Sequence, residues 1–228
     1  MSQLKICGIR DSETMILLAR LQVTYAGFVF AKSKRQVSTE EARQIVEQAR
    51  VEGAKLPNAS TITLPQLVGV FVNPTMEEVT EAVMRVPLHV IQLHGTETPT
   101  FCAKVRARFP QCEVWKAIGI GNEGDYKERI QSYKENADAL LFDTHDEKQA
   151  GGTGRRFSWS EIPLLTKDTS PRVTVIAGGI TPDNVTELRR DYDPAIIDLS
   201  SGVETEGKKD KEKIKMLVER MGQHVAGV

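Results

Sequence analysis

The chain has 228 residues, of which 40% are hydrophobic and 27% are charged, and its formal net charge is -1. This composition is typical of an ordinary globular protein, and the length suits one α/β barrel domain over residues 1–228. The balanced charge argues against a nucleic-acid-binding protein, and none of the apolar runs approaches the roughly 18 residues of a transmembrane helix.

The cysteines of the chain are Cys7, Cys102 and Cys112. Because their number is small and odd, a disulfide framework is not expected. The first residues lack the long apolar segment of a secretory signal peptide. We therefore expect a cytoplasmic protein in which Cys102 and Cys112 have structural roles.

Short apolar runs alternate with amphipathic segments along the whole chain. Runs with the length and composition of strands lie at 4–7, 25–30, 67–72, 88–93, 114–118, 139–142, 173–177 and 195–199. Helical spacing or helix-start signals predict helices at 15–22, 38–50, 75–86, 99–109, 125–134, 160–166, 181–190 and 211–221. Ser38 with Glu41, and Thr75 with Glu78, fit the capping-box pattern at two of the helix starts.

This alternation of strands and helices predicts a parallel sheet, because the crossovers are too long for hairpins. Eight such units are the number found in a (β/α)8 TIM barrel, which we predict as the fold. The structural alternative is a doubly wound open sheet. We rank it lower because the first strand is not followed by the GxGxxG turn of dinucleotide-binding folds.

Two segments interrupt the pattern. Residues 53–65 lengthen the connection before the third strand, and we expect a surface insertion there, away from the carboxyl ends of the strands. Residues 207–215 are rich in charges, and we interpret them as the solvated start of the last helix and not as a binding tail.

In a barrel of this kind the chemistry lies at the carboxyl ends of the strands. Glycines follow the seventh and eighth strands, in AGGIT and SSGVE, and a further cluster, GGTG, follows the sixth. Glycine lets backbone N–H groups approach an anion closely, and the loops after strands seven and eight bind phosphate in this fold. The predicted phosphate site consists of Gly154, Gly178, Gly179, Ser201 and Gly202.

Asp143 and Cys7 lie at strand ends, where they could act as acid–base groups, but each also has a purely structural interpretation. Asp143 ends an apolar strand, where partial desolvation favours a proton donor, but an Asp there can equally accept hydrogen bonds from loop N–H groups. Cys7 follows the first strand, where a cysteine is more often a small buried hydrophobe than a base.

Other polar residues carry weaker signals. The four histidines lack the spacing of a metal site, so we do not expect a metal ion. Arg35, in the segment KSKR, suggests a loop that faces an anion.

The order of the motifs along the chain resembles one family. KICG, GFVF with KSKR, VGVFVN, QLHG, LLFDT, GGTG, AGGI and DLSSGVE follow one another as in the phosphoribosylanthranilate isomerases of tryptophan biosynthesis. The resemblance covers essentially the whole chain. AGGI is shared by many phosphate-binding barrels, whereas KICG, QLHG and DLSSGVE in this order are highly specific.

The resemblance implies a cofactor-free Amadori rearrangement of N-(5'-phosphoribosyl)anthranilate to 1-(2-carboxyphenylamino)-1-deoxyribulose 5-phosphate, the third step of tryptophan synthesis from chorismate. By motif match, Asp143 is the general acid that protonates the furanose oxygen. Cys7 is the base that removes a proton from the neighbouring carbon, and Arg35 faces the anthranilate. The other side chains that would line the pocket are Gln92, His94 and Asp198.

The implied roles demand unusual protonation states. A free carboxyl group titrates near about 3.9 and a free thiol near about 8.5, so at neutral pH each starts in the wrong state for its role. We therefore predict a bell-shaped pH–rate profile that belongs to the coupled pair.

Two alternatives stay open. Another phosphosugar barrel enzyme would use metal ligands, which are not evident, or catalytic Lys and Glu residues, and Lys5 and Lys116 lie within predicted strands. A non-catalytic barrel that binds a phosphate ligand would not need both Cys7 and Asp143. In either case the expected partner is a small phosphorylated molecule, and the chain is a monomer or a homodimer.

Overall fold

The computed structural model describes residues 2–56, 62–120, 126–144 and 158–222. Eight parallel strands form a closed barrel in chain order, and β1 pairs with both β2 and β8. The strands are β1 (Gln3–Cys7), β2 (Tyr25–Val29), β3 (Gln66–Phe71), β4 (Val90–Leu93), β5 (Glu113–Ile120), β6 (Ala139–Thr144), β7 (Val173–Ile176) and β8 (Ile196–Leu199). The predicted TIM barrel is confirmed, and the open sheet is excluded.

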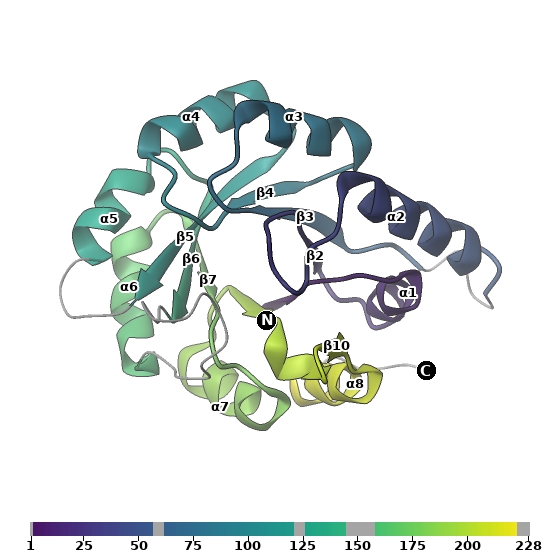
Figure 1. Cartoon of the computed structure of the whole chain (residues 1–228). Coiled ribbons are helices and arrows are strands. Elements are labelled where there is room, and N and C mark those ends of the chain that lie inside the picture. The colour runs from purple at the N-terminus through teal and green to yellow at the C-terminus, as the bar shows by residue number, and fades with distance from the viewer. Residues whose placement is uncertain (1, 57–61, 121–125, 145–157, 223–228) are drawn as a thin grey trace.

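Helices form a ring around the outside of the barrel (Figure 1). They are α1 (Ser12–Arg20), α2 (Thr39–Gly53), α3 (Met76–Arg85), α4 (Pro99–Arg108), α5 (Tyr126–Tyr133), α6 (Ile162–Thr169), α7 (Pro182–Tyr192) and α8 (Lys211–Arg220). Two short 3₁₀ helices, Trp159–Glu161 and Ser201–Val203, precede α6 and follow β8. A small antiparallel hairpin of β9 (Glu204–Thr205) and β10 (Lys208–Lys209) leads into α8.

The apolar core has two layers, because successive side chains of a strand point to opposite faces of the sheet. The larger layer lies between the strands and the helices and includes Leu4 and Ile6 of β1. The second layer fills the inside of the barrel, as side chains do in this fold. Its members are Cys7, Tyr25, Val68, Val70, Val90, Trp115, Ala117, Ala139, Leu141, Val175, Ala177 and Ile196.

The two predicted capping boxes are confirmed. Ser38 Oγ accepts from the N–H of Glu41, and the Glu41 carboxylate accepts from the N–H of Ser38. Thr75 and Glu78 make the same reciprocal pair. Each cap typically stabilises its helix by about 1 kcal/mol. The caps therefore fix the residues at which the loops after β2 and β3 end.

The fourth strand is shorter than predicted. It begins at Val90 and not at Leu88, because the N–H of Leu88 donates to Val86 O in a tight turn at 2.7 Å. The side chain of Leu88 still packs in the outer core layer, which explains why this residue resembled part of a strand in the sequence.

The interpretation of residues 207–215 as a solvated helix start is wrong for Lys209. This residue belongs to β10, and its side chain is 3% exposed because its ammonium pairs with Glu204 Oε1 at 2.7 Å. The helix itself begins at Lys211, with Asp210 as its N-cap.

The expected insertion at 53–65 lies partly outside the described residues. In the described part, α2 extends three residues beyond the predicted end, to Gly53. Among the described helices, none combines the length and apolar character needed to span a membrane.

Candidate active site

Polar side chains occupy inward-facing positions at the carboxyl ends of four strands. Cys7 ends β1 and belongs to the interior layer of the barrel. Asp198 lies on β8, in register with Lys5. Gln92 on β4 and Asp143 on β6 each follow an interior residue by two positions, so they continue the same face. Strands β1, β4, β6 and β8 therefore present polar groups to one barrel mouth.

Asp143 faces His94 across this mouth. Asp143 Oδ2 lies 3.6 Å from His94 Nε2, and about a third of each side chain is exposed (33% and 32%). Gln92 Nε2 donates to His94 Nδ1 at 2.8 Å. Because Nδ1 accepts this bond, the hydrogen of the neutral imidazole lies on Nε2, the atom that faces Asp143. Asp143 is thus oriented by a side-chain pair and stays accessible to a ligand.

Cys7 lies beside a buried ion pair. Lys5 Nζ donates to Asp198 Oδ2 at 2.8 Å, and the Lys5 side chain is fully buried. Burial raises the pKa of the Cys7 thiol above its usual value, and the charge of Asp198 raises it further. Lys5 and Lys209 act in the opposite direction, because a cation favours the thiolate. The thiol is therefore mostly protonated at neutral pH.

Two buried oxygen atoms at the mouth have no hydrogen-bond partner among the described residues. They are Gln92 Oε1 and Asp198 Oδ1. Buried polar atoms are normally paired, because an unpaired one loses its hydration without compensation. A polar ligand in the barrel mouth would supply the missing partners.

Arg35 is held by a carboxylate and does not extend into solvent. Its Nε and Nη2 atoms donate to the two oxygens of Glu204 at 2.7 and 2.8 Å. Lys209 also pairs with Glu204 and donates to Ser200 O at 2.9 Å. Burial alone would raise the pKa of Glu204, but the hydrogen bonds from Arg35 and Lys209 outweigh it and lower this pKa to about 2. The carboxylate is charged at neutral pH and joins the loop after β2 to the β9–β10 hairpin.

The glycine loops after β7 and β8 lie against each other. Gly178 and Gly179 have φ angles of 87° and 63°, which side chains with a Cβ rarely adopt. A Cβ built on Gly202 would lie 1.9 Å from Ile180 O, so only glycine allows this approach. The structure therefore brings Gly178, Gly179, Ser201 and Gly202 together. Gly154 lies outside the described residues.

A buried ion pair outside the barrel wall supports the loop after β4. Lys116 Nζ lies 2.9 Å from Glu97 Oε2 and donates to Gly95 O at 2.7 Å. Glu97 also accepts from the N–H groups of Gly95 and Asn73. Because Gly95 directly follows His94, these bonds fix the backbone that carries the histidine.

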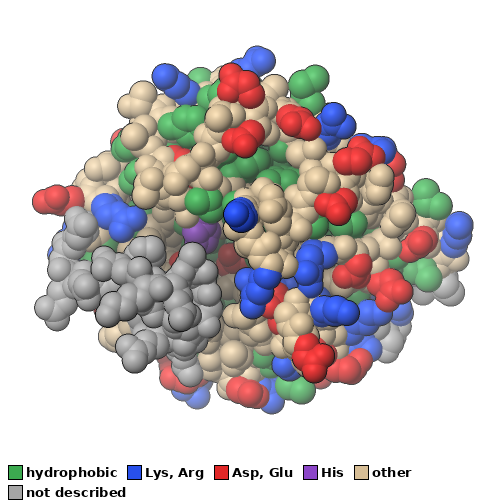
Figure 2. All heavy atoms as spheres, viewed as in Figure 1, with side chains coloured by type: hydrophobic (Ala, Val, Ile, Leu, Met, Phe, Trp, Pro, Cys, Tyr) green, Lys and Arg blue, Asp and Glu red, His purple; other side chains and the backbone are tan. Residues whose placement is uncertain are grey.

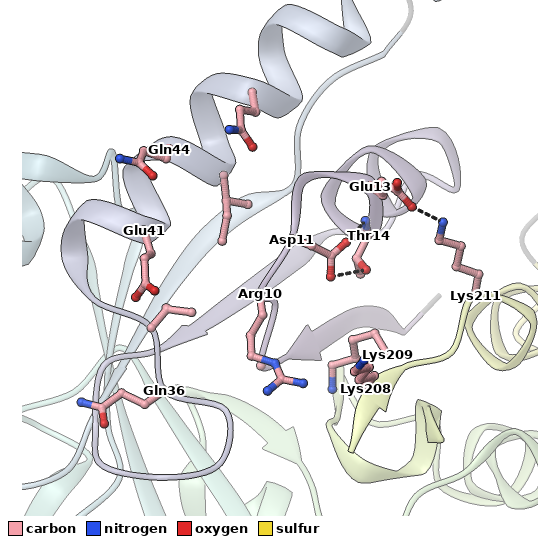
Figure 3. Close-up of a pocket in the computed structure, with 14 residues that line it drawn as sticks. Arg10, Asp11, Glu13, Thr14, Gln36, Glu41, Gln44, Lys208, Lys209 and Lys211 are labelled. Atoms are coloured by element: carbon pink, nitrogen blue, oxygen red, sulfur yellow. Dashed lines mark hydrogen bonds and ion pairs between the residues drawn. The ribbon is translucent and has the colours of Figure 1, made fainter. Parts of the chain in front are cut away.

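A groove of about 660 Å³ lies beside the barrel mouth, between α1, α2 and the β9–β10 hairpin (Figure 3). Gly8 and Lys209 contribute to its lining, but neither of the acid–base candidates does. Arg10 donates to Lys34 O at 2.9 Å and to Gly207 O at 2.7 Å, so it links the loop after β2 to the hairpin. Figure 2 shows Lys and Arg side chains gathered between these two segments.

Comparison with known proteins decides the family. Residues 4–220 match the model of the family described as N-(5'-phosphoribosyl)anthranilate isomerase. The chain belongs to the N-(5'-phosphoribosyl)anthranilate isomerase family. It is an isomerase of tryptophan biosynthesis. The family and enzyme class implied by the ordered motifs are confirmed, as is the barrel predicted from the alternation of strands and helices.

The relatives of this isomerase family cover nearly the full chain. The enzyme of Brevibacillus brevis is 52% identical over 98% of this chain and 95% of its own, and that of Bacillus subtilis is 37% identical over 98% and 96%. The solved isomerase of Thermotoga maritima is 37% identical with a TM-score of 0.79, over 97% of this chain and 99% of that chain. Another solved isomerase, 34% identical with a TM-score of 0.76 and the same coverage, holds reduced 1-(o-carboxyphenylamino)-1-deoxyribulose 5-phosphate.

The sequence did not identify every charged residue at the mouth of this isomerase. Lys5, Glu204 and Lys209 were not among the predicted site residues. Lys5 could have been found, because it precedes Cys7 by two positions on one strand and must face the same side. The contact between Arg35 and Glu204 joins residues 169 positions apart, and no local sequence pattern predicts it. Among the described residues, no group of three or more His, Cys, Asp or Glu side chains is placed to hold a metal ion.

Replacing Gly202 by alanine is expected to lower the thermal unfolding midpoint of the isomerase, because the new Cβ would collide with Ile180 O. Overpacking of this kind typically costs about 1–3 kcal/mol. Gly53→Ala is the matched control, since a Cβ at position 53 meets no atom within 4 Å. Circular dichroism melts check the result. Equal midpoints for the two variants would contradict the close approach of the loops.

Proposed function

We propose that this chain converts N-(5'-phosphoribosyl)anthranilate into 1-(2-carboxyphenylamino)-1-deoxyribulose 5-phosphate by a cofactor-free Amadori rearrangement. The observation that carries the proposal is the presence of a carboxyl group, Asp143, and a thiol, Cys7, at inward-facing positions of the same barrel mouth. The family supports the choice of substrate, because the relatives carry that name and one solved relative holds a reduced form of this product.

The first step in the proposed mechanism is ring opening. Protonated Asp143 gives its proton to the furanose ring oxygen, and the bond between this oxygen and C1 of the ribose breaks. The lone pair of the anthranilate nitrogen forms a double bond to C1, which gives a Schiff base. His94 Nε2 faces the Asp143 carboxylate at 3.6 Å, so it stabilises the charge that remains after the proton has left.

The second step is the removal of a proton from C2 of the ribose. The ionised sulfur of Cys7 takes this proton, and the electron pair of the C–H bond moves toward the Schiff-base nitrogen to form an enolamine. Tautomerisation with protonation at C1 then gives the ketose. Because burial raises the pKa of Cys7, the thiolate is a minor species at neutral pH, and the predicted bell-shaped profile belongs to Cys7 and Asp143 as a pair.

The remaining mouth residues are assigned to binding in the same proposal. Backbone N–H groups of the glycine loops after β7 and β8 hold the phosphate, since glycine lets them approach it closely. Arg35 uses Nε and Nη2 for Glu204, which leaves Nη1 for the anthranilate carboxylate. Gln92 Oε1 and Asp198 Oδ1, the two oxygens without partners among the described residues, accept from the sugar hydroxyl groups.

The proposal also covers the cellular location, the oligomeric state and the partners of the enzyme. A cytoplasmic location agrees with the three free cysteines, Cys7, Cys102 and Cys112, and the net charge of -1 gives no support to a nucleic-acid partner. The chain acts as a monomer or a homodimer, which light scattering would distinguish. A small phosphorylated substrate is its partner.

A fluorescence assay with freshly made N-(5'-phosphoribosyl)anthranilate tests the proposed reaction. We expect the anthranilate signal to decay with the wild-type chain and not with buffer alone. Chromatography of the quenched mixture should show the carboxyphenylamino ketose. Tight binding of the reduced product without any turnover would instead support a non-catalytic barrel that binds a phosphate ligand.

A further inference from the structure

A pair of opposite charges lies inside the barrel directly below Cys7. Lys5 precedes Cys7 by two residues on β1, so both side chains face the interior. The Lys5 side chain is 0% exposed and that of Asp198 8%, and Nζ and Oδ2 lie 2.8 Å apart. The other members of this inner layer that surround them, Tyr25 and Trp115 among them, are apolar or aromatic.

Packing alone does not account for these charges. Taking two ions out of water costs several kcal/mol for each, and apolar residues of similar volume often replace a buried pair with no loss of stability. The pair is also incomplete, because Asp198 Oδ1 has no hydrogen-bond partner among the described residues. A buried ion pair kept beside a reactive group suggests an electrostatic task at that group.

We propose that Lys5 is a positioning residue for the isomerisation, whose ammonium group, anchored by Asp198, stabilises the ionised sulfur of Cys7 when this side chain acts as the base. The inference rests on the proposed role of Cys7 and deepens it. It explains how a thiol in an almost fully buried position can reach its charged form, because a nearby cation offsets the loss of hydration.

The charges around Cys7 come from four elements. Lys5 on β1 lowers the pKa of the thiol through its charge and a hydrogen bond, and this charge is the largest influence after burial. Asp198 on β8 raises that pKa, and Lys209 on β10 lowers it. Arg35, in the loop after β2, also interacts with the Cys7 charge. Lys209 and Arg35 both pair with Glu204, whereas Lys5 lies on the same strand as Cys7 and faces the same side.

The test is the pH dependence of the alkylation of Cys7 by iodoacetamide, followed by mass spectrometry of the Cys7 peptide in folded protein. Alkylation follows the thiolate population. Lys5→Met removes a cation that lowers the thiol pKa, so the alkylation midpoint should move to higher pH by about one unit or more. At neutral pH this corresponds to alkylation about tenfold slower or more, and kcat should fall while affinity for the reduced product persists.

Asp198→Asn is expected to shift the alkylation midpoint of Cys7 in the direction opposite to Lys5→Met. This substitution removes an anion that raises the thiol pKa, so its midpoint should move to lower pH. A merely structural pair predicts shifts in the same direction for both variants, because each breaks the same contact. Midpoints that move together, or a Lys5→Met midpoint equal to that of wild type, would overturn the inference.

Two further variants complete the test, one in case Lys5→Met does not fold and one as a control. Lys5→Met leaves Asp198 buried without its partner, so the double variant Lys5→Met/Asp198→Asn serves if the single one does not fold. Its midpoint should still rise, because the influence of Lys5 on Cys7 exceeds that of Asp198. Lys116→Met is the matched control. It also removes a buried, paired lysine, but one outside the barrel wall, and should leave the Cys7 midpoint unchanged.

Failure of this inference and failure of the proposed function give different results. If Cys7→Ser is inactive and the Lys5→Met midpoint does not move, Cys7 is the base without help from Lys5. If Cys7→Ser retains full turnover, the role of Cys7 is wrong, whatever the alkylation midpoints show.

Discussion

Asparagine in place of Asp143 is expected to lower kcat by about 10²–10⁴-fold, the range that a general acid typically supplies. The amide has nearly the same shape as the carboxyl group but carries no acidic proton for the furanose oxygen. His94 would still face position 143, held by its bond from Gln92, so the mouth should keep its geometry. Steady-state kinetics and calorimetry with the reduced product should therefore show a loss of turnover with affinity nearly retained.

Asp138→Asn is the control for this variant. Asp138 directly precedes β6 at the opposite end from Asp143, where it accepts from the N–H of Val114 at 2.9 Å and pairs with Arg106. An asparagine there can still accept from Val114, so kcat should stay near that of wild type. Wild-type turnover in Asp143→Asn would remove Asp143 from the mechanism. Equal losses of turnover in both variants would indicate that the substitutions disturb folding and not the chemical step.

Serine in place of Cys7 is the second change with a large expected effect, again a drop in kcat of about 10²–10⁴-fold. A hydroxyl group is a far weaker acid than a thiol, so the lysine beside it would stabilise almost no alkoxide. The substitution is nearly isosteric, and binding of the reduced product should persist. Single-turnover measurements separate the chemical step from product release.

Cys112→Ser is the matched control for the thiol. Cys112 is buried and its Sγ donates to Leu88 O at 3.2 Å, a bond that a serine can also make. Its turnover should equal that of wild type. If Cys7→Ser were as active as Cys112→Ser, another group would have to remove the proton from C2.

Much of this architecture follows from local pattern. Runs such as YAGFV in β2 are buried on both faces, so they appear in the sequence as continuous apolar segments. The helix starts at Ser38 and Thr75 are set by contacts within three residues. Both kinds of signal depend on neighbours in the chain, which is why the barrel and its order of elements could be predicted.

The candidate site was predictable only in part, because its electrostatics depend on contacts between distant strands. Cys7 and Asp143 were predicted from their place after apolar runs and from the motif match. The contact between Lys5 and Asp198 joins positions 193 residues apart and exists only because the barrel closes between β1 and β8. Asp198 as the partner of Lys5, and Lys209 as a further cation near Cys7, could therefore be named only from the closed barrel.

The incorporation of solvent deuterium into the product tests the central claim, that an acid–base pair moves protons without a cofactor. The reaction is run in D₂O with wild-type chain and N-(5'-phosphoribosyl)anthranilate, and the product is examined by proton NMR at C1 of the ketose. Proton removal from C2 followed by protonation of the enolamine predicts a product with solvent deuterium at C1. A ketose with two protons and no deuterium at C1, one of them carried over from C2 of the substrate, would contradict the account, because it would indicate a direct hydride shift from C2 to C1.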